Sequence, residues 1–130
     1  MSLVEIHTRL SSTATLFTGA LALWALFLRF RAKPLDGNWL GAAVIGEVVL
    51  LAQSLLGFYL YLQGGGTALP RPFLHILYGI VSIITLPAAY GYFNTLDDEN
   101  VKTLAMAAAC IFLWGIILRA SYVAEFAPPI

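Results

Sequence analysis

Four long runs of apolar residues, separated by short polar connections, dominate the hydrophobic pattern of the chain. The runs cover about residues 10–30, 39–62, 72–93 and 102–123. Each is close to the ~20 residues that a helix needs to cross the hydrocarbon core of a bilayer. They are too long and too continuously apolar for the alternating strands of a membrane barrel. The pattern therefore predicts four transmembrane helices.

The connections contain the residues that end and begin helices. They cover residues 31–38, 64–71 and 94–100. Ser2 and Glu5 have the spacing of a capping box, which predicts that the first helix begins at Leu3, before its apolar run. Short connections make neighbouring helices antiparallel. The sequence therefore predicts an all-α, integral membrane up-down four-helix bundle, with residues 1–130 forming a single domain.

Composition supports a membrane protein and excludes other classes. Hydrophobic residues make up 60% of the chain, charged residues only 11%, and the mean hydropathy is +0.84. A soluble domain has about 25% charged residues. The formal net charge is zero, so there is no basic field for nucleic acid, and membrane lipids are the expected surroundings. A single cysteine, Cys110, excludes an intrachain disulfide framework and a cysteine-only metal site.

Cations at the ends of the runs give an orientation. One side of the membrane has Arg29, Arg31, Lys33 and Lys102, and the other has Arg9, Arg71 and Arg119. The positive-inside rule then favours both termini outside the cytoplasm. The expected location is the prokaryotic inner membrane or an equivalent energy-transducing membrane.

The two histidines of the chain fall at similar depth near one membrane face. His7 lies about one turn into the first predicted helix, and His75 about one turn into the third. In an up-down bundle these two helices begin on the same side. Two imidazoles facing each other are the axial ligands of a low-spin b-type heme. We therefore expect His7 and His75 to bind heme iron, with heme b as the cofactor.

Small and cationic residues near the histidines fit the same interpretation. A porphyrin placed edge-on between helices needs small residues beside each ligand, and the candidates are Ser11, Gly79 and Ser82. Guanidinium groups pair with carboxylates such as heme propionates, and the candidates are Arg9, Arg71 and Arg119. The alternative is that these are interfacial histidines, snorkelling arginines and small residues of ordinary helix packing.

Glu47 is the other unusual residue within the spans. It lies about one third into the second run, toward the membrane face opposite the histidines, and an ionisable residue at that depth is costly. A proton-handling or quinone-site role and a protonated carboxyl bonded to another helix or a partner both stay open. Gln53, near the middle of the same run, is expected to link helices.

Three segments, in order along the chain, resemble the heme A synthase family. They are Glu-Ile-His-Thr-Arg at residues 5–9, Gln-Ser-Leu-Leu-Gly at residues 53–57 and Leu-His-Ile-Leu-Tyr-Gly at residues 74–79. The resemblance covers about the first 85 residues. It implies one four-helix half of an eight-helix heme-binding fold, with His7 and His75 as axial ligands. Gly57 joins the residues that would make room for the heme.

The sequence departs from that family at its acid and at its second histidine pair. In the family a glutamate precedes the first histidine as Glu-x-x-His and takes part in oxidising a heme methyl group, whereas here the pattern is Glu5-x-His7. Residues two apart on a helix point about 200° apart, so Glu5 and His7 do not share a face. We assign no catalytic residue. One chain would hold one heme at most, although a homodimer would restore eight helices.

The sequence therefore predicts a heme b-binding, bis-histidine membrane protein in electron transfer or heme handling. The alternative is a cofactor-free or pigment-binding accessory subunit of a respiratory or photosynthetic membrane complex. A heme-modifying enzyme and a small channel rank below these two. The expected partners are a second copy of the chain or a larger membrane complex.

Overall fold

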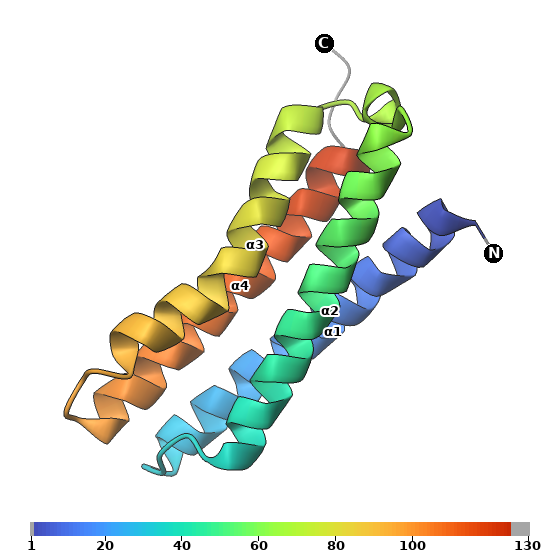
Figure 1. Ribbon diagram of the computed structural model, residues 1–130. Helices are drawn as coiled ribbons and strands as arrows, with labels where there is room; N and C mark the ends of the chain where they lie inside the picture. The colour runs from blue at the N-terminus through green and yellow to red at the C-terminus, as the bar shows by residue number, and fades with distance from the viewer. Residues whose placement is uncertain (1, 126–130) are drawn as a thin grey trace.

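The computed structural model describes residues 2–125 and consists of four long helices (Figure 1). They are α1 (Leu3–Phe30), α2 (Gly37–Leu62), α3 (Pro72–Phe93) and α4 (Glu99–Glu125), with a short 3-10 turn, η1 (Gly65–Ala68), between α2 and α3. Successive helices run in opposite directions. The predicted all-α, up-down four-helix bundle is confirmed.

α4 is the helix that contacts its neighbours most extensively. It packs along both α1 and α3, whereas α2 packs chiefly on α1 and only sparsely on α3. The four helices thus form a ring in chain order, with α1 and α3 diagonally opposed. The beginnings of α1 and α3 and the ends of α2 and α4 lie at one end of the bundle (Figure 1).

Side chains that accept hydrogen bonds from free backbone N–H groups begin three of the helices. The Ser2 hydroxyl accepts from the N–H of Glu5 at 3.1 Å, and α1 begins at Leu3 as predicted. Asp36 caps α2 in the same way, and Asp98 accepts from two amides in the first turn of α4. These caps satisfy donors that the helix itself leaves unpaired.

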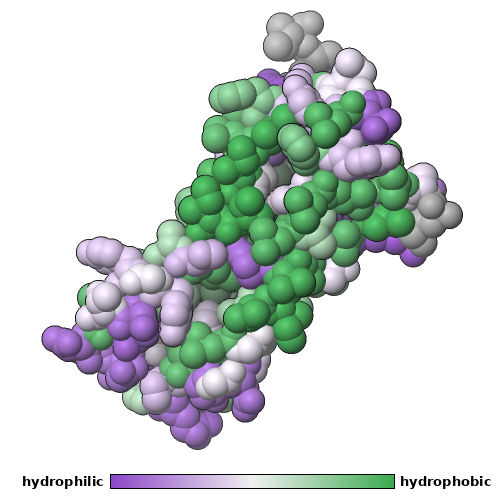
Figure 2. Space-filling model, viewed as in Figure 1, coloured by the Kyte–Doolittle hydropathy of each residue, from purple (hydrophilic) through white to green (hydrophobic). Residues whose placement is uncertain are grey.

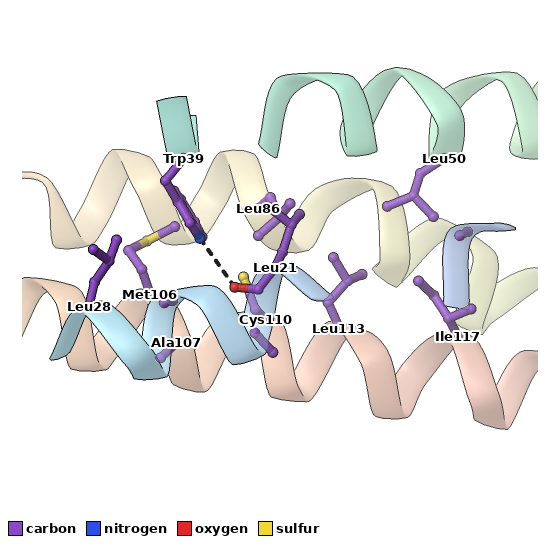
Figure 3. Packing of buried hydrophobic residues seen from close by; sticks show 13 residues of the cluster. Leu21, Leu28, Trp39, Leu50, Leu86, Met106, Ala107, Cys110, Leu113 and Ile117 are labelled. Atoms are coloured by element: carbon purple, nitrogen blue, oxygen red, sulfur yellow. Dashed lines mark hydrogen bonds between the residues drawn. The ribbon is translucent and has the colours of Figure 1, made fainter. Parts of the chain in front are cut away.

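The buried core lies along the middle of α4 and extends to the start of α2. Cys110 and Leu113 of α4 are fully buried, and so is Trp39 in the first turn of α2. The Trp39 indole N–H donates to the Leu21 carbonyl of α1 at 3.2 Å, as Figure 3 shows. An indole at this position both fills the space between helices and satisfies its own donor. Trp39 therefore anchors α2 to α1.

The surface around the middle of the bundle is apolar. On the face seen in Figure 2, most side chains over the central part are hydrophobic, and hydrophilic ones gather toward the ends. All four helices are long and apolar enough to cross a membrane. Threonine hydroxyls within them donate to carbonyls of their own helix, as Thr18 does to Ala14 at 2.8 Å and Thr85 does to Val81 at 2.7 Å. The fold is thus compatible with an integral membrane protein, while the membrane and the orientation stay predictions.

We expect Trp39→Ala to lower the free energy of unfolding by about 3–5 kcal/mol, because it leaves a cavity between α2 and α1 and removes the bond to Leu21. Phe58→Ala is the matched control, since Phe58 is an aromatic residue of α2 that is 61% exposed. Its expected cost is within about 0.5 kcal/mol. Unfolding of detergent-solubilised protein, followed by circular dichroism, measures both. Equal losses would show that Trp39 does not anchor α2.

Candidate functional site

His7 and His75 meet inside the bundle. Their ring centroids are 6.2 Å apart and their planes make an angle of 77°. Because α1 and α3 are diagonal neighbours, this contact crosses the bundle interior near the end where both helices begin. The sequence predicted similar depth for the two rings, and the helix packing brings them together.

The His75 ring is fixed by a hydrogen bond to α4. Its Nδ1 lies 2.9 Å from the carbonyl oxygen of Ala120. A carbonyl can only accept, so Nδ1 carries the proton and donates it. The lone pair of the neutral ring is then on Nε2. Metal-binding histidines commonly have this arrangement, in which one ring nitrogen donates to a carbonyl and the other binds the metal.

The His7 ring packs against the backbone of α2 at Gly57. A Cβ atom at position 57 would lie 2.9 Å from Cε1 of His7, closer than real Cβ contacts come. Gly57 thus makes room for the imidazole itself. The Nδ1 atom of His7 is shielded from solvent and has no hydrogen-bond partner among residues 2–125. Gln53, one turn earlier on α2, lies beside the ring but outside hydrogen-bond geometry.

The other small residues have different surroundings. The Ser11 hydroxyl is 2.9 Å from the hydroxyl of Ser121 and joins α1 to α4. Ser82 is buried and donates to the carbonyl of Gly79 at 2.6 Å. A Cβ on Gly79 would meet no atom within 4 Å. Of the residues predicted to make room for a heme, Gly79 therefore has open space beside it, while Ser11 already has a partner. Their role toward a heme stays a prediction.

The three candidate propionate partners lie at the same end of the bundle as the histidines. Arg9 is exposed near the start of α1, and Arg71 is half-buried immediately before α3. The exposed Arg119 guanidinium stands over the Tyr122 ring at 5.3 Å. Cations at this end can approach an anionic group at the membrane surface.

Glu5 of α1 and Glu47 of α2 differ in exposure and in hydrogen bonding. Glu5 is exposed in the first turn of α1, and its N–H is capped by Ser2. Both carboxyl oxygens of Glu47 are shielded, and neither has a hydrogen-bond partner in the described part of the chain. The alternative of a bond from Glu47 to a neighbouring helix thus has no support within residues 2–125.

A cavity of about 230 Å³ lies at the end of the bundle opposite the histidines. It is lined in part by Tyr90 and Lys102 and reaches neither histidine.

Sequence reasoning missed the residues of α4 that hold the His75 ring and the helix of His7. Ala120 and Ser121 gave no signal, because a backbone carbonyl and a single serine are recognisable only when their partners are known. The approach of Gln53 and Gly57 to His7 had a weak signal. These two residues are four apart, so they share a face of α2.

Comparison of the chain with protein-family models, curated proteins and solved structures gives no significant match. The assignment of a function therefore depends on the geometry of the chain itself.

We expect Gly57→Ala to push the His7 ring out of its position and to destabilise the protein by about 1–3 kcal/mol through overpacking. Gly79→Ala is the matched control, because its added methyl group enters open space and alanine favours a helix by up to about 1 kcal/mol. Chemical unfolding in mixed micelles would compare the two. The packing of His7 on Gly57 is refuted if Gly57→Ala is as stable as the parent protein.

Proposed function

We propose that the protein binds one b-type heme between His7 and His75 and acts in electron transfer or heme handling at a membrane face. The observation that carries the proposal is the 6.2 Å separation of the two imidazole centroids across the bundle. A metal–imidazole bond is about 2 Å long, so two imidazoles on opposite sides of one metal have ring centres roughly 6 Å apart. The pair thus has the spacing that axial ligation of one metal needs.

The donor set supports a heme over a bare metal ion. No group of three or more His, Cys, Asp or Glu side chains that could hold a metal exists within residues 2–125. Two imidazoles leave most coordination positions of an ion unfilled, whereas a porphyrin supplies four nitrogens in a plane and needs only axial ligands. The Nδ1–H of His75, which donates to Ala120, leaves the right nitrogen for ligation.

The other residues of the site have supporting parts in this proposal. Arg9, Arg71 and Arg119 would pair with propionates at the membrane surface, where guanidinium forks match carboxylate geometry. The open space beside Gly79 is where part of the ring system could lie. When bound, the heme supplies a one-electron redox centre whose potential depends on its axial ligands.

The position of the two histidines along their helices supports an exchange of electrons or heme at one face of the membrane. Both histidines lie near the end of their helices, so the proposed centre is close to the membrane surface. Association with a second copy or with a larger membrane complex belongs to the same proposal. The alternative function, a cofactor-free or pigment-binding accessory subunit, predicts that the protein has no b-type heme spectrum.

We expect the gently solubilised protein to show the sharp reduced bands of a low-spin b-type heme after dithionite addition, with heme b recovered on extraction. His75→Ala abolishes this spectrum because it removes one axial ligand, while membrane insertion is unchanged. Thr8→Ala, at an exposed residue next to His7 whose hydroxyl bonds only its own helix, leaves the spectrum intact.

A low-spin spectrum that survives His75→Ala would make the ligand assignment wrong. A parent protein with no Soret band, or with a chlorophyll spectrum, that co-purifies stoichiometrically with a large complex would support the accessory-subunit alternative instead.

A further inference from the structure

The His7 ring packs on α2 at Gly57, one turn after Gln53, and both His7 and Gln53 have a buried polar atom without a partner in the described part of the chain. His7 Nδ1 and Gln53 Oε1 are both shielded from solvent, and neither has a hydrogen-bond partner among the described residues. Both the backbone carbonyl and the side-chain amide of Gln53 are close enough to interact with the His7 ring. An imidazole N–H and an amide oxygen are complementary donor and acceptor.

Leaving these atoms unpaired is costly. A buried donor or acceptor without a partner costs about 1–3 kcal/mol. Because both atoms are shielded from solvent, water does not replace the missing partner. Pairing the two atoms with each other removes both penalties at once.

The other histidine already has the equivalent bond. His75 donates from Nδ1 to the Ala120 carbonyl of α4 at 2.9 Å. A bond from His7 Nδ1 to Gln53 of α2 would give the second ring the same protonation pattern. Each histidine would then be oriented by an oxygen acceptor from a neighbouring helix, and both would have a free lone pair on Nε2.

We propose that Gln53 is a positioning residue for His7. Its amide oxygen accepts a hydrogen bond from Nδ1–H and orients the ring so that Nε2 is free to bind the iron. This inference rests on the proposed heme-binding function and deepens it, because it names the group that sets the orientation and basicity of one axial ligand. Outer-shell partners of this kind typically contribute about 10- to 100-fold in metal affinity.

We expect nitrogen NMR spectra of the heme-free protein, isotope-labelled at histidine, to show the proton on Nδ1 in both rings. Gln53→Leu removes the side-chain acceptor and keeps the backbone carbonyl. The His7 signals therefore change, while those of His75, bound to Ala120, stay the same and serve as an internal control. Gln53→Glu retains an acceptor and keeps the Nδ1 proton. Ser54→Ala, at the next residue of α2, leaves both rings unchanged.

Heme titration of the same variants completes the test. Gln53→Leu is expected to weaken heme binding by about 10- to 100-fold and to raise the midpoint potential, because the axial ligand becomes less basic. Gln53→Glu lowers the potential, since a carboxylate acceptor makes the imidazole more basic. A variant that only loosened the fold would not move the potential in opposite directions.

The two proposals fail in different ways. Gln53 is not a positioning residue if the His7 signals of Gln53→Leu match those of the parent protein, even when the parent protein binds heme. If the His7 signals change but no variant binds heme, the orientation of His7 by Gln53 stands and the heme-binding function is refuted.

Discussion

The close packing of α4 between α1 and α3 is the constraint on which the other contacts of the bundle depend. Lipid is as apolar as leucine, so helices in a membrane associate through close van der Waals packing and hydrogen bonds between them. The buried face of α4 has small side chains at Thr103, Ala107 and Cys110, all fully buried. Along the first half of α4, these residues allow α1 and α3 to lie close to it. Because both helices pack on α4, their separation from each other is fixed as well.

The same helix sets the geometry of the histidine pair. Near the end of α4, the Ala120 carbonyl accepts a hydrogen bond from the His75 ring. The next residue, Ser121, bonds Ser11 of α1. Ser11 is four residues after His7, on the same face of α1. Two adjacent residues of α4 therefore hold the helix of one histidine and the ring of the other. α2 completes the site from the opposite side, with Gly57 packed against the His7 ring. All four helices thus contribute to a site whose two central groups come from only two of them.

The helices were predictable because the information for them is local. Apolar length and capping residues gave four helices, and Ser2 with Glu5 gave the start of α1. Three helices begin before their apolar runs, at Leu3 for α1, as the cap predicted, at Gly37 for α2 and at Glu99 for α4. A helix end is set by hydrogen bonding of the first turn, whereas an apolar run marks only the part within the hydrocarbon. The depth of His7 and His75 followed from counting residues along each helix, at about 1.5 Å per residue.

The contacts between side chains were not predictable in the same way. The sequence did not indicate that Ser11, the residue expected to make room beside His7, bonds Ser121. The role of Gly57 toward a heme stays a prediction, and only the structure places it against the His7 ring. The sequence by itself determined the number, length and direction of the helices, because each helix satisfies its backbone internally and its apolar length matches a membrane. Only the tertiary structure decided that His7 meets His75 and Gln53, because the rotation of each helix about its axis results from many weak contacts summed over the whole bundle.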